Sequence, residues 1–282
     1  MEPRSPVEIL SYASDAGMLK AKRSFLSLMI LSFFAGAFVA FAAAGSNMAA
    51  FNLLANPDTY GLGRLVVGIV FGTALLLVVL AGGDLFTGNC LLIIPVLDRK
   101  LSPIKFAFNL LMVYLGNFLG GLLIAWMNYQ SGLFDVSGGL LGGVTIEIAA
   151  GKTSLPFHSA FIMGILCNWL VCVAVWISWA SRDISGKILL MSSVICLFAI
   201  SAYEHSIANI YYISAGLFAA QKPEWLSMAN LSMEELNSLN IYNFLFTNLL
   251  PVTLGNFIGG AGFVGLLYWL ALGRNGKIQD QS

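Results

Sequence analysis

The segment NLLMVYLGNFLGG, residues 109–121, recurs almost unchanged as NLLPVTLGNFIGG at residues 248–260. The two copies differ at only three of their thirteen positions. Both contain two glycines four residues apart, in GNFLG (116–120) and GNFIG (255–259), and this spacing lets two helices approach closely within a membrane. The recurrence therefore predicts equivalent helices in two related halves of the chain, with these glycines at helix–helix contacts.

The composition indicates that lipid covers most of this chain. Of the 282 residues, 58% are hydrophobic and only 10% are charged, whereas a soluble domain has about 25% charged residues. The formal net charge is +0, so nothing suggests a nucleic-acid partner. The cysteines lie in apolar segments and have neither metal-site nor disulfide spacing, so we predict no cofactor or metal and expect small core residues at Cys90, Cys167, Cys172 and Cys196.

Six apolar stretches are long enough to cross a bilayer, at 25–45, 64–97, 103–128, 156–180, 187–219 and 242–272. A membrane-spanning helix needs about 20 apolar residues. The second and fifth stretches are too long for one straight span and too short for two spans with a turn between them. We therefore predict that each contains a helix that breaks and resumes inside the membrane.

The recurring segment lies in the third stretch and again in the sixth, so each half has three spans. Because three is an odd number, the halves have opposite topology, and such inverted repeats build transporters and channels. We expect an all-α membrane protein with six transmembrane helices. Its expected parts are an N-terminal cytoplasmic segment (1–24), the first three-helix repeat (25–128), an outer connection (129–155), the second repeat (156–272) and a cytoplasmic tail (273–282).

The distribution of Lys and Arg predicts that both termini are cytoplasmic. With the N-terminus inside, eleven of the fourteen cationic residues lie on the inner side, and only Arg64, Lys152 and Lys222 lie outside. Cationic residues are enriched in cytoplasmic loops. The segment AFAAAGS (40–46) resembles a signal-peptidase site, but acidic residues precede it and its apolar run has span length, so we expect no cleavage.

The two stretches that are predicted to break also align, with AGGDLFTGN (81–89) opposite SAYEHSIAN (201–209). Each acidic residue precedes a resumed half-helix, whose first N–H groups lack helical partners. We therefore predict half-helix capping by Asp84, Glu204, Asn89 and Asn209. Chain direction brings both half-helix N-termini to the middle from opposite sides, and their partial positive charge favours an anion.

His205 lies deep in an apolar stretch, where ionisable residues are costly and are functional candidates. The alignment places it near Thr87 of the other break, where a permeating species would pass. On these residues alone, a hydrogen-bonded core histidine remains the alternative. The other histidine, His158, is expected at the outer membrane interface.

Four motifs make the chain resemble the formate/nitrite transporter family over residues 5–272. They are DLFT after a glycine pair, GILCNWLVCVAVW, YEHSIAN and PVTLGNFIGG, in the family's order and spacing. The resemblance implies an aquaporin-like six-helix protomer in the bacterial plasma membrane and a homopentamer with one pore per protomer. The implied substrates are small monovalent weak-acid anions: formate, nitrite, hydrosulfide, sometimes acetate or lactate.

The same resemblance implies roles for individual residues. His205 corresponds to the pore histidine, Thr87 to the threonine beside it, Lys152 to the lysine of the outer vestibule and Asn168 to a pore-facing asparagine. The implied apolar constrictions are Phe71, Leu75, Leu85, Phe86 and Phe198. The residues after Thr87 differ from those of some formate-channel relatives, so the preferred anion stays open.

These roles suggest a route in which Lys152 attracts the anion and His205 supplies or shares a proton. A neutral acid then passes the second constriction, because desolvating a bare anion costs several kcal/mol or more. The sequence leaves open whether transport is proton symport or a pH-gated leak. It also leaves open a channel for a neutral solute such as water or ammonia. An enzyme is disfavoured because Ser–His–Asp and zinc spacings are absent from the sequence.

Overall fold

The computed structural model describes residues 2–279, and no β-strand occurs among them. Residues 280–282 of the expected cytoplasmic tail lie outside the described part. Within it, five helices are long and apolar enough to cross a membrane: Phe25–Leu54, Pro57–Ala81, Pro103–Gln130, Phe157–Ala180 and Asn243–Gly273. Three shorter apolar helices are Phe86–Leu97, Ile184–Ile200 and Ser206–Ala219.

α-Helices make up most of the described chain. Up to the outer connection they are α1 (Pro6–Ala21), α2 (Phe25–Leu54), α3 (Tyr60–Phe71), α4 (Thr73–Ala81), α5 (Phe86–Asn89), α6 (Ile93–Leu97) and α7 (Pro103–Gln130). The rest are α8 (Leu140–Thr153), α9 (Phe157–Ala180), α10 (Ile184–Ile200), α11 (Ser206–Ala219), α12 (Pro223–Leu226), α13 (Met233–Ser238), α14 (Leu250–Phe257) and α15 (Leu267–Gln279). Short 3-10 turns occur at Pro57–Thr59, Cys90–Leu92 and Leu133–Asp135, and π-helical segments at Asn243–Leu249 and Ile258–Leu266.

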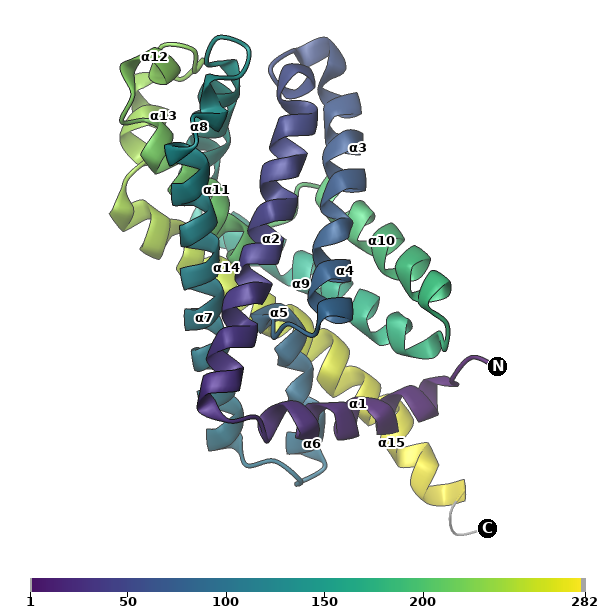
Figure 1. Cartoon of the computed structure of the whole chain (residues 1–282). Helices are drawn as coiled ribbons and strands as arrows, with labels where there is room; N and C mark the ends of the chain where they lie inside the picture. The colour runs from purple at the N-terminus through teal and green to yellow at the C-terminus, as the bar shows by residue number, and fades with distance from the viewer. Residues whose placement is uncertain (1, 280–282) are drawn as a thin grey trace.

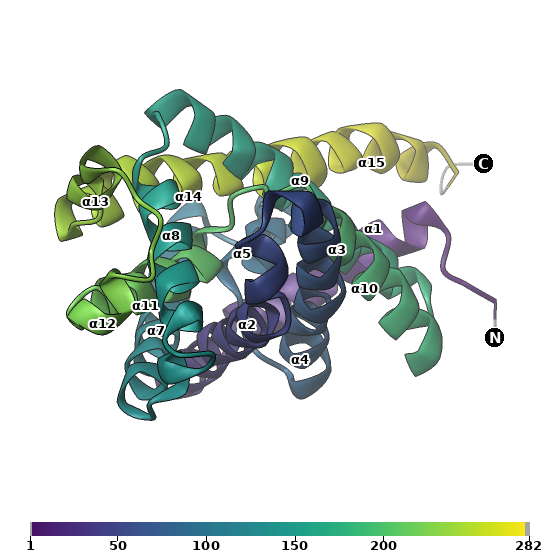
Figure 2. The same cartoon turned by 90° about the horizontal axis from the view of Figure 1, so that it is seen from above.

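Helices α2, α3 and α7 stand roughly upright in Figure 1, the segment from α14 to α15 runs obliquely, and α1 lies across the lower end of the bundle. Helices α8, α12 and α13 gather at the opposite end, and both chain termini lie at the side of the molecule where α1 begins. Seen from above in Figure 2, α2 lies between α7 and α11 on one side and α3 and α10 on the other. This packing brings α5 and α11, which resume after the two breaks, into the centre of the bundle.

The two copies of the recurring segment make equivalent close helix crossings. On α7, a Cβ added at Gly120 would overlap the carbonyl oxygen of Phe33 on α2. On the second copy, a Cβ added at Gly259 would overlap the carbonyl oxygen of Ile165 on α9. The predicted helix–helix role of these glycines is therefore confirmed within one protomer, because only glycine permits backbones to meet so closely.

Both predicted breaks are present, at residues 82–85 and 201–205. Gly82 and Ala202, which the alignment pairs, both have left-handed backbones, with φ of 86° and 57°. The two broken stretches are unequal, however: 25 residues from Pro57 to Ala81 precede the first break, whereas α10 has 17. The expected start of the second stretch at residue 64 is too late. The helix begins before Arg64 and includes it. The guanidinium is accommodated there because it donates to backbone carbonyls at the end of α10.

Candidate functional site

The two breaks bring Thr87 and His205 together, as the alignment predicted. Thr87 Oγ1 lies 3.1 Å from His205 Nε2, and both side chains are buried. The other ring nitrogen, Nδ1, accepts the backbone N–H of Ala208 at 3.1 Å and so caps α11. A ring nitrogen that accepts a hydrogen bond carries no proton, so this contact assigns the proton of the neutral ring to Nε2, which faces Thr87.

An asparagine from the first copy of the recurring segment holds the first break. Asn117 Oδ1 accepts the N–H of Phe86, the first residue of α5, at 2.9 Å. Its Nδ2 donates to the carbonyl oxygens of Asp84 at 2.9 Å and Ser32 at 2.7 Å. One fully buried amide thus satisfies two backbone groups that the interruption leaves without helical partners, and it anchors them to α2 through the Ser32 carbonyl oxygen.

The second break is held in the same way by the second copy of the segment. Asn256 Oδ1 accepts the N–H of Ser206, the first residue of α11, at 2.9 Å. Its Nδ2 donates to the carbonyl oxygens of Glu204 at 2.9 Å and Gly164 at 2.8 Å. The recurrence of this asparagine is therefore explained by the backbone geometry of the breaks.

At the first break, the carboxylate of Asp84 pairs with cations from the N-terminal segment. It forms ion pairs with Arg23 and, at 3.2 Å, with Lys20. Asn89 Nδ2 donates to Asp84 at 3.3 Å and to Asn109 Oδ1 at 3.0 Å, while Asn89 Oδ1 accepts from Lys20 at 2.7 Å. This network ties α1 and the chain before α2 to the break.

At the second break, Glu204 occupies the equivalent position. Lys152 Nζ lies 2.7 Å from Glu204 Oε1. Asn209 Nδ2 donates to Glu204 Oε2 at 2.6 Å and to Asn248 Oδ1 at 2.8 Å, and Asn248 Nδ2 donates to the carbonyl oxygen of Lys152 at 2.9 Å. Lys152, in the last turn of α8, is thus bound to the acidic residue of the second break.

The capping roles predicted for four of these residues are wrong. Asp84, Glu204, Asn89 and Asn209 use their side chains for the two ion-pair networks, whereas the free N–H groups of α5 and α11 bond to other partners. An acidic side chain beside a helix start has the right position for a cap, but a nearby cation competes for it. The signal for the true capping residues was present, because both asparagines lie in the recurring segment.

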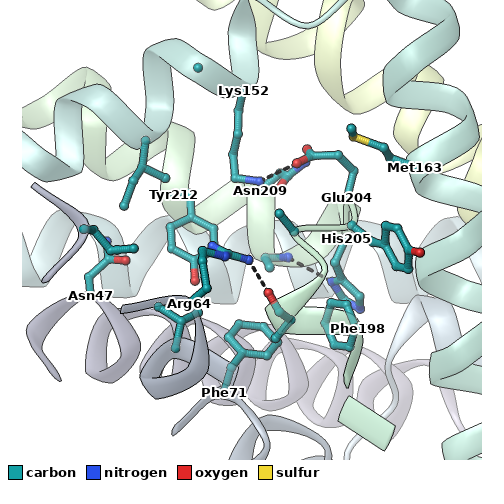
Figure 3. Close-up of a pocket in the computed structure, with 18 of the residues that line it drawn as sticks. Asn47, Arg64, Phe71, Lys152, Met163, Phe198, Glu204, His205, Asn209 and Tyr212 are labelled. Carbon is teal, nitrogen blue, oxygen red and sulfur yellow. Dashed lines mark hydrogen bonds and ion pairs between the residues drawn. The ribbon is translucent and has the colours of Figure 1, made fainter. Parts of the chain in front are cut away.

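A cavity of about 460 Å³ opens above the histidine, on the side of α8. His205, Phe71 and Phe198 line its deep end, and Lys152 and Glu204 line its wall (Figure 3). The rings of Phe71 and Phe198 meet edge to face at 5.7 Å, and Phe198 lies 6.1 Å from the His205 ring. The cavity therefore ends in an aromatic contact directly beside the histidine.

Three further residues expected at constrictions are buried but do not line this cavity. Leu75 lies on α4, while Leu85 and Phe86 lie at the first break. The Phe86 ring packs edge to face against Tyr114 at 5.2 Å. These three residues therefore belong to the buried core and not to the cavity wall.

Asn168 is fully buried and does not line the cavity. Its Nδ2 donates to the carbonyl oxygens of Thr87 at 3.2 Å and Asn256 at 2.6 Å, so it links the two breaks. His158 is exposed at the start of α9. Three cysteines are buried and the fourth is partly buried, as expected for core residues.

Several polar residues of the cavity were not expected from the sequence, among them Asn47 on α2 and Arg64 on α3. Arg64 donates to the carbonyl oxygens of Ala199 and Ile200 at the end of α10. Its isolation as a cation within a long apolar stretch was an available signal. Within residues 2–279, no group of His, Cys, Asp and Glu has the arrangement of a metal site.

The formate/nitrite transporter family model matches residues 7–270. The formate channel FocA of Escherichia coli K12 is 34% identical over 271 residues, which cover 94% of this chain and 93% of FocA. The formate channel BtFdhC of Bacillus thuringiensis is 33% identical over 270 residues, which cover 94% of each protein.

Solved structures agree in fold. A pentameric formate channel with formate bound superposes with a TM-score of 0.77 at 31% identity, covering 89% of this chain and 98% of that one. An FNT family ion channel superposes with a TM-score of 0.77 at 28% identity, covering 94% of this chain and 98% of its own. With matching motifs, matching fold and a family model that spans nearly its whole length, this chain belongs to the formate/nitrite transporter family, whose members are membrane channels and not enzymes.

Proposed function

We propose that this protein conducts small monovalent weak-acid anions (formate, nitrite and hydrosulfide) across a bacterial plasma membrane, and that His205 couples passage to a proton. Relatives that are named formate channels, together with the family match, support the substrate class. The observation that carries the histidine's role is its contact with Thr87 at the closed end of the cavity. In this proposal, the anion meets the titratable ring at the apolar barrier.

The route begins in the cavity, which we place on the outer side of the membrane. The anion descends past Lys152 and reaches Phe71 and Phe198. Because transfer of a bare anion into an apolar contact costs several kcal/mol or more, neutralisation of the anion lowers the barrier. Nε2–H of His205 and the Thr87 hydroxyl are the donors that meet it there.

Proton transfer at His205 involves the break itself. The neutral ring already holds its proton on Nε2, so the imidazolium forms when a proton adds to Nδ1. That proton displaces the Ala208 N–H, which Nδ1 accepts in the neutral state. The loss of a helix cap costs about 1 kcal/mol. A bound anion offsets this cost. Transfer of the Nε2 proton to the anion leaves a neutral ring with its proton on Nδ1, and the cap re-forms when Nδ1 releases that proton and Nε2 takes one up again.

In this proposal, the molecule has six crossings with cytoplasmic termini, and its halves form an aquaporin-like inverted repeat whose breaks lie near the bilayer midplane. The chain assembles as a homopentamer, with one pore in each protomer. A solved pentameric relative and the span-length apolar helices support this arrangement. We place residues 1–24 and 273–282 in the cytoplasm and the connection 129–155 outside.

Flux measurements in proteoliposomes test the proposal directly. We expect uptake of formate, nitrite and hydrosulfide, together with a dependence on membrane potential or proton gradient, and no uptake of glycerol or urea. Equal permeability to glycerol and formate, without any response to the gradients, would instead identify a channel for neutral solutes. Native mass measurement in mild detergent tests the pentamer.

A further inference from the structure

We propose that the cavity contains an outer subsite, formed by Arg64 and Asn47, that holds planar two-oxygen anions before they reach His205. This inference rests on the proposed function and specifies which anions the cavity favours. Both residues line the cavity, and Figure 3 shows them on its wall away from His205. They come from α2 and α3, which pack together as neighbours in the chain.

Arg64 has more N–H donors than its contacts with the protein use. A guanidinium carries five N–H groups. One contact goes from Nη2 to the carbonyl oxygen of Ala199 and another from Nε to that of Ile200, at 3.4 Å. Among residues 2–279, no carboxylate lies within ion-pair distance of Arg64, so three N–H groups and the full charge remain for a ligand.

Asn47 supplies a second donor that the folded chain leaves unused. Its side chain is only 3% exposed, and its Nδ2 has no hydrogen-bond partner within the described residues. A buried amide left unpaired costs about 1–3 kcal/mol. An anion in the cavity relieves this cost, because it accepts the bond that the protein does not provide.

Neighbouring contacts place the two side chains at a similar level of the bundle. Ser46 Oγ, beside Asn47 in the chain, lies 3.5 Å from the carbonyl oxygen of Val67. Val67 is three residues after Arg64, about one turn of α3. The amide and the guanidinium therefore face the cavity from adjacent helices within one helical turn of each other.

The charges around the cavity assign the capture of the anion to Arg64 rather than to Lys152. Lys152 is paired with Glu204 at 2.7 Å, which largely neutralises both. The other lining carboxylate, Glu147, accepts the N–H of Asn230 at 2.6 Å, and burial raises its pKa, which favours its neutral form. Arg64 is thus the cavity cation that has no carboxylate partner among the described residues.

The geometry of the guanidinium decides the chemical class of the ligand. Its planar fork donates two parallel bonds to two oxygens of one planar anion. Formate and nitrite have two such oxygens, whereas hydrosulfide has a single sulfur atom. The outer subsite should therefore favour formate and nitrite over hydrosulfide, while His205 and Thr87 can act on all three.

The test distinguishes the contribution of the planar guanidinium of Arg64 from that of its positive charge. In proteoliposomes at low ionic strength, Arg64→Lys retains the charge but loses the fork. We expect the half-saturating concentrations of formate and nitrite to rise about tenfold, as for the loss of one strong hydrogen bond, and that of hydrosulfide to change less than about twofold. Lys222→Gln is the matched control, because Lys222 is also expected outside but lies over the Trp225 ring, not in the cavity.

Asn47→Leu tests the subsite independently of Arg64→Lys, because it leaves the hydrogen bonds from Arg64 to α10 intact. It should raise the half-saturating concentration of formate about threefold to tenfold without altering its maximal flux. Unchanged formate and nitrite saturation in both variants would overturn the subsite, as would equal shifts for hydrosulfide. If Arg64→Lys does not assemble, Asn47→Leu alone decides. Wild-type protein that takes up no formate would instead reject the proposed function.

Discussion

The two breaks share a backbone frame but differ in the chemistry they present. Each has a left-handed residue, an acid bound to a cation, and a buried asparagine that bonds to the interrupted backbone. Leu85 and Phe86 follow the acid in the first break, whereas His205 and Ser206 follow it in the second. The shared parts are those that any interrupted helix requires, and the differing parts are the ones that an anion would meet.

The asparagines of the recurring segment should give the largest effect. Asn117→Leu removes the partner of the Phe86 N–H and the Asp84 carbonyl, and Asn256→Leu removes that of the equivalent two groups at the second break. At about 1–3 kcal/mol for each unpaired group, we expect loss of the assembled protein from detergent extracts, measured by size-exclusion chromatography. Asn52→Leu, at an exposed position of α2, is the control. Wild-type assembly in both variants would show that the breaks hold without these amides.

The two acids should differ in how much stability their loss costs. Glu204→Gln leaves the Lys152 side chain, only 17% exposed, without its counter-charge. Asp84→Asn releases Lys20 and Arg23, whose side chains are 30% and 27% exposed and turn more readily to water. We expect losses of about 3 kcal/mol for Glu204→Gln and about half that for Asp84→Asn. Denaturant unfolding in detergent measures both, and the reverse order would contradict the comparison.

The histidine and threonine that meet between the breaks should affect transport more than folding. His205→Asn keeps polarity but cannot titrate, so we expect a flattened flux profile between about pH 5 and 7, the range around the ordinary histidine value. Proton movement should also uncouple from formate uptake. Thr87→Val should give a milder change, because it removes only the partner of Nε2. An internal pH dye follows both, and full pH dependence in His205→Asn would assign the proton to another group.

The smallest effects should come from the paired left-handed residues. Ala202 has φ of 57°, a conformation that costs a residue with a Cβ about 1 kcal/mol, whereas glycine adopts it freely. Ala202→Gly should therefore change stability little or raise it slightly, and Gly82→Ala should lower it by about 1 kcal/mol. Opposite signs in the two melting curves support equivalent backbones at the two breaks. Equal signs would mean that the alignment pairs unlike positions.

Local sequence was a good guide where one segment's own residues set the outcome. Long apolar stretches predicted the spans, and glycine spacing predicted the close crossings. The alignment of residues 81–89 with 201–209 predicted where both helices stop. Capping was mispredicted because an acidic side chain at a break can bind either a backbone N–H or a cation. Which of the two it binds depends on the cation that the fold brings next to it. Lys20 and Lys152 come from distant parts of the chain.

By itself, the sequence determined that this chain crosses a membrane, that it has two related halves, that two of its helices break, and that it belongs with anion transporters. These properties follow from hydrophobic length, recurrence and motif, which are carried by residues close together in the chain. Only the tertiary structure decided which asparagines hold the breaks, which cations are paired, and that Arg64 and Asn47 enter the same cavity. The physical reason is that buried polar groups must find partners, and the partner in each case lies on another helix.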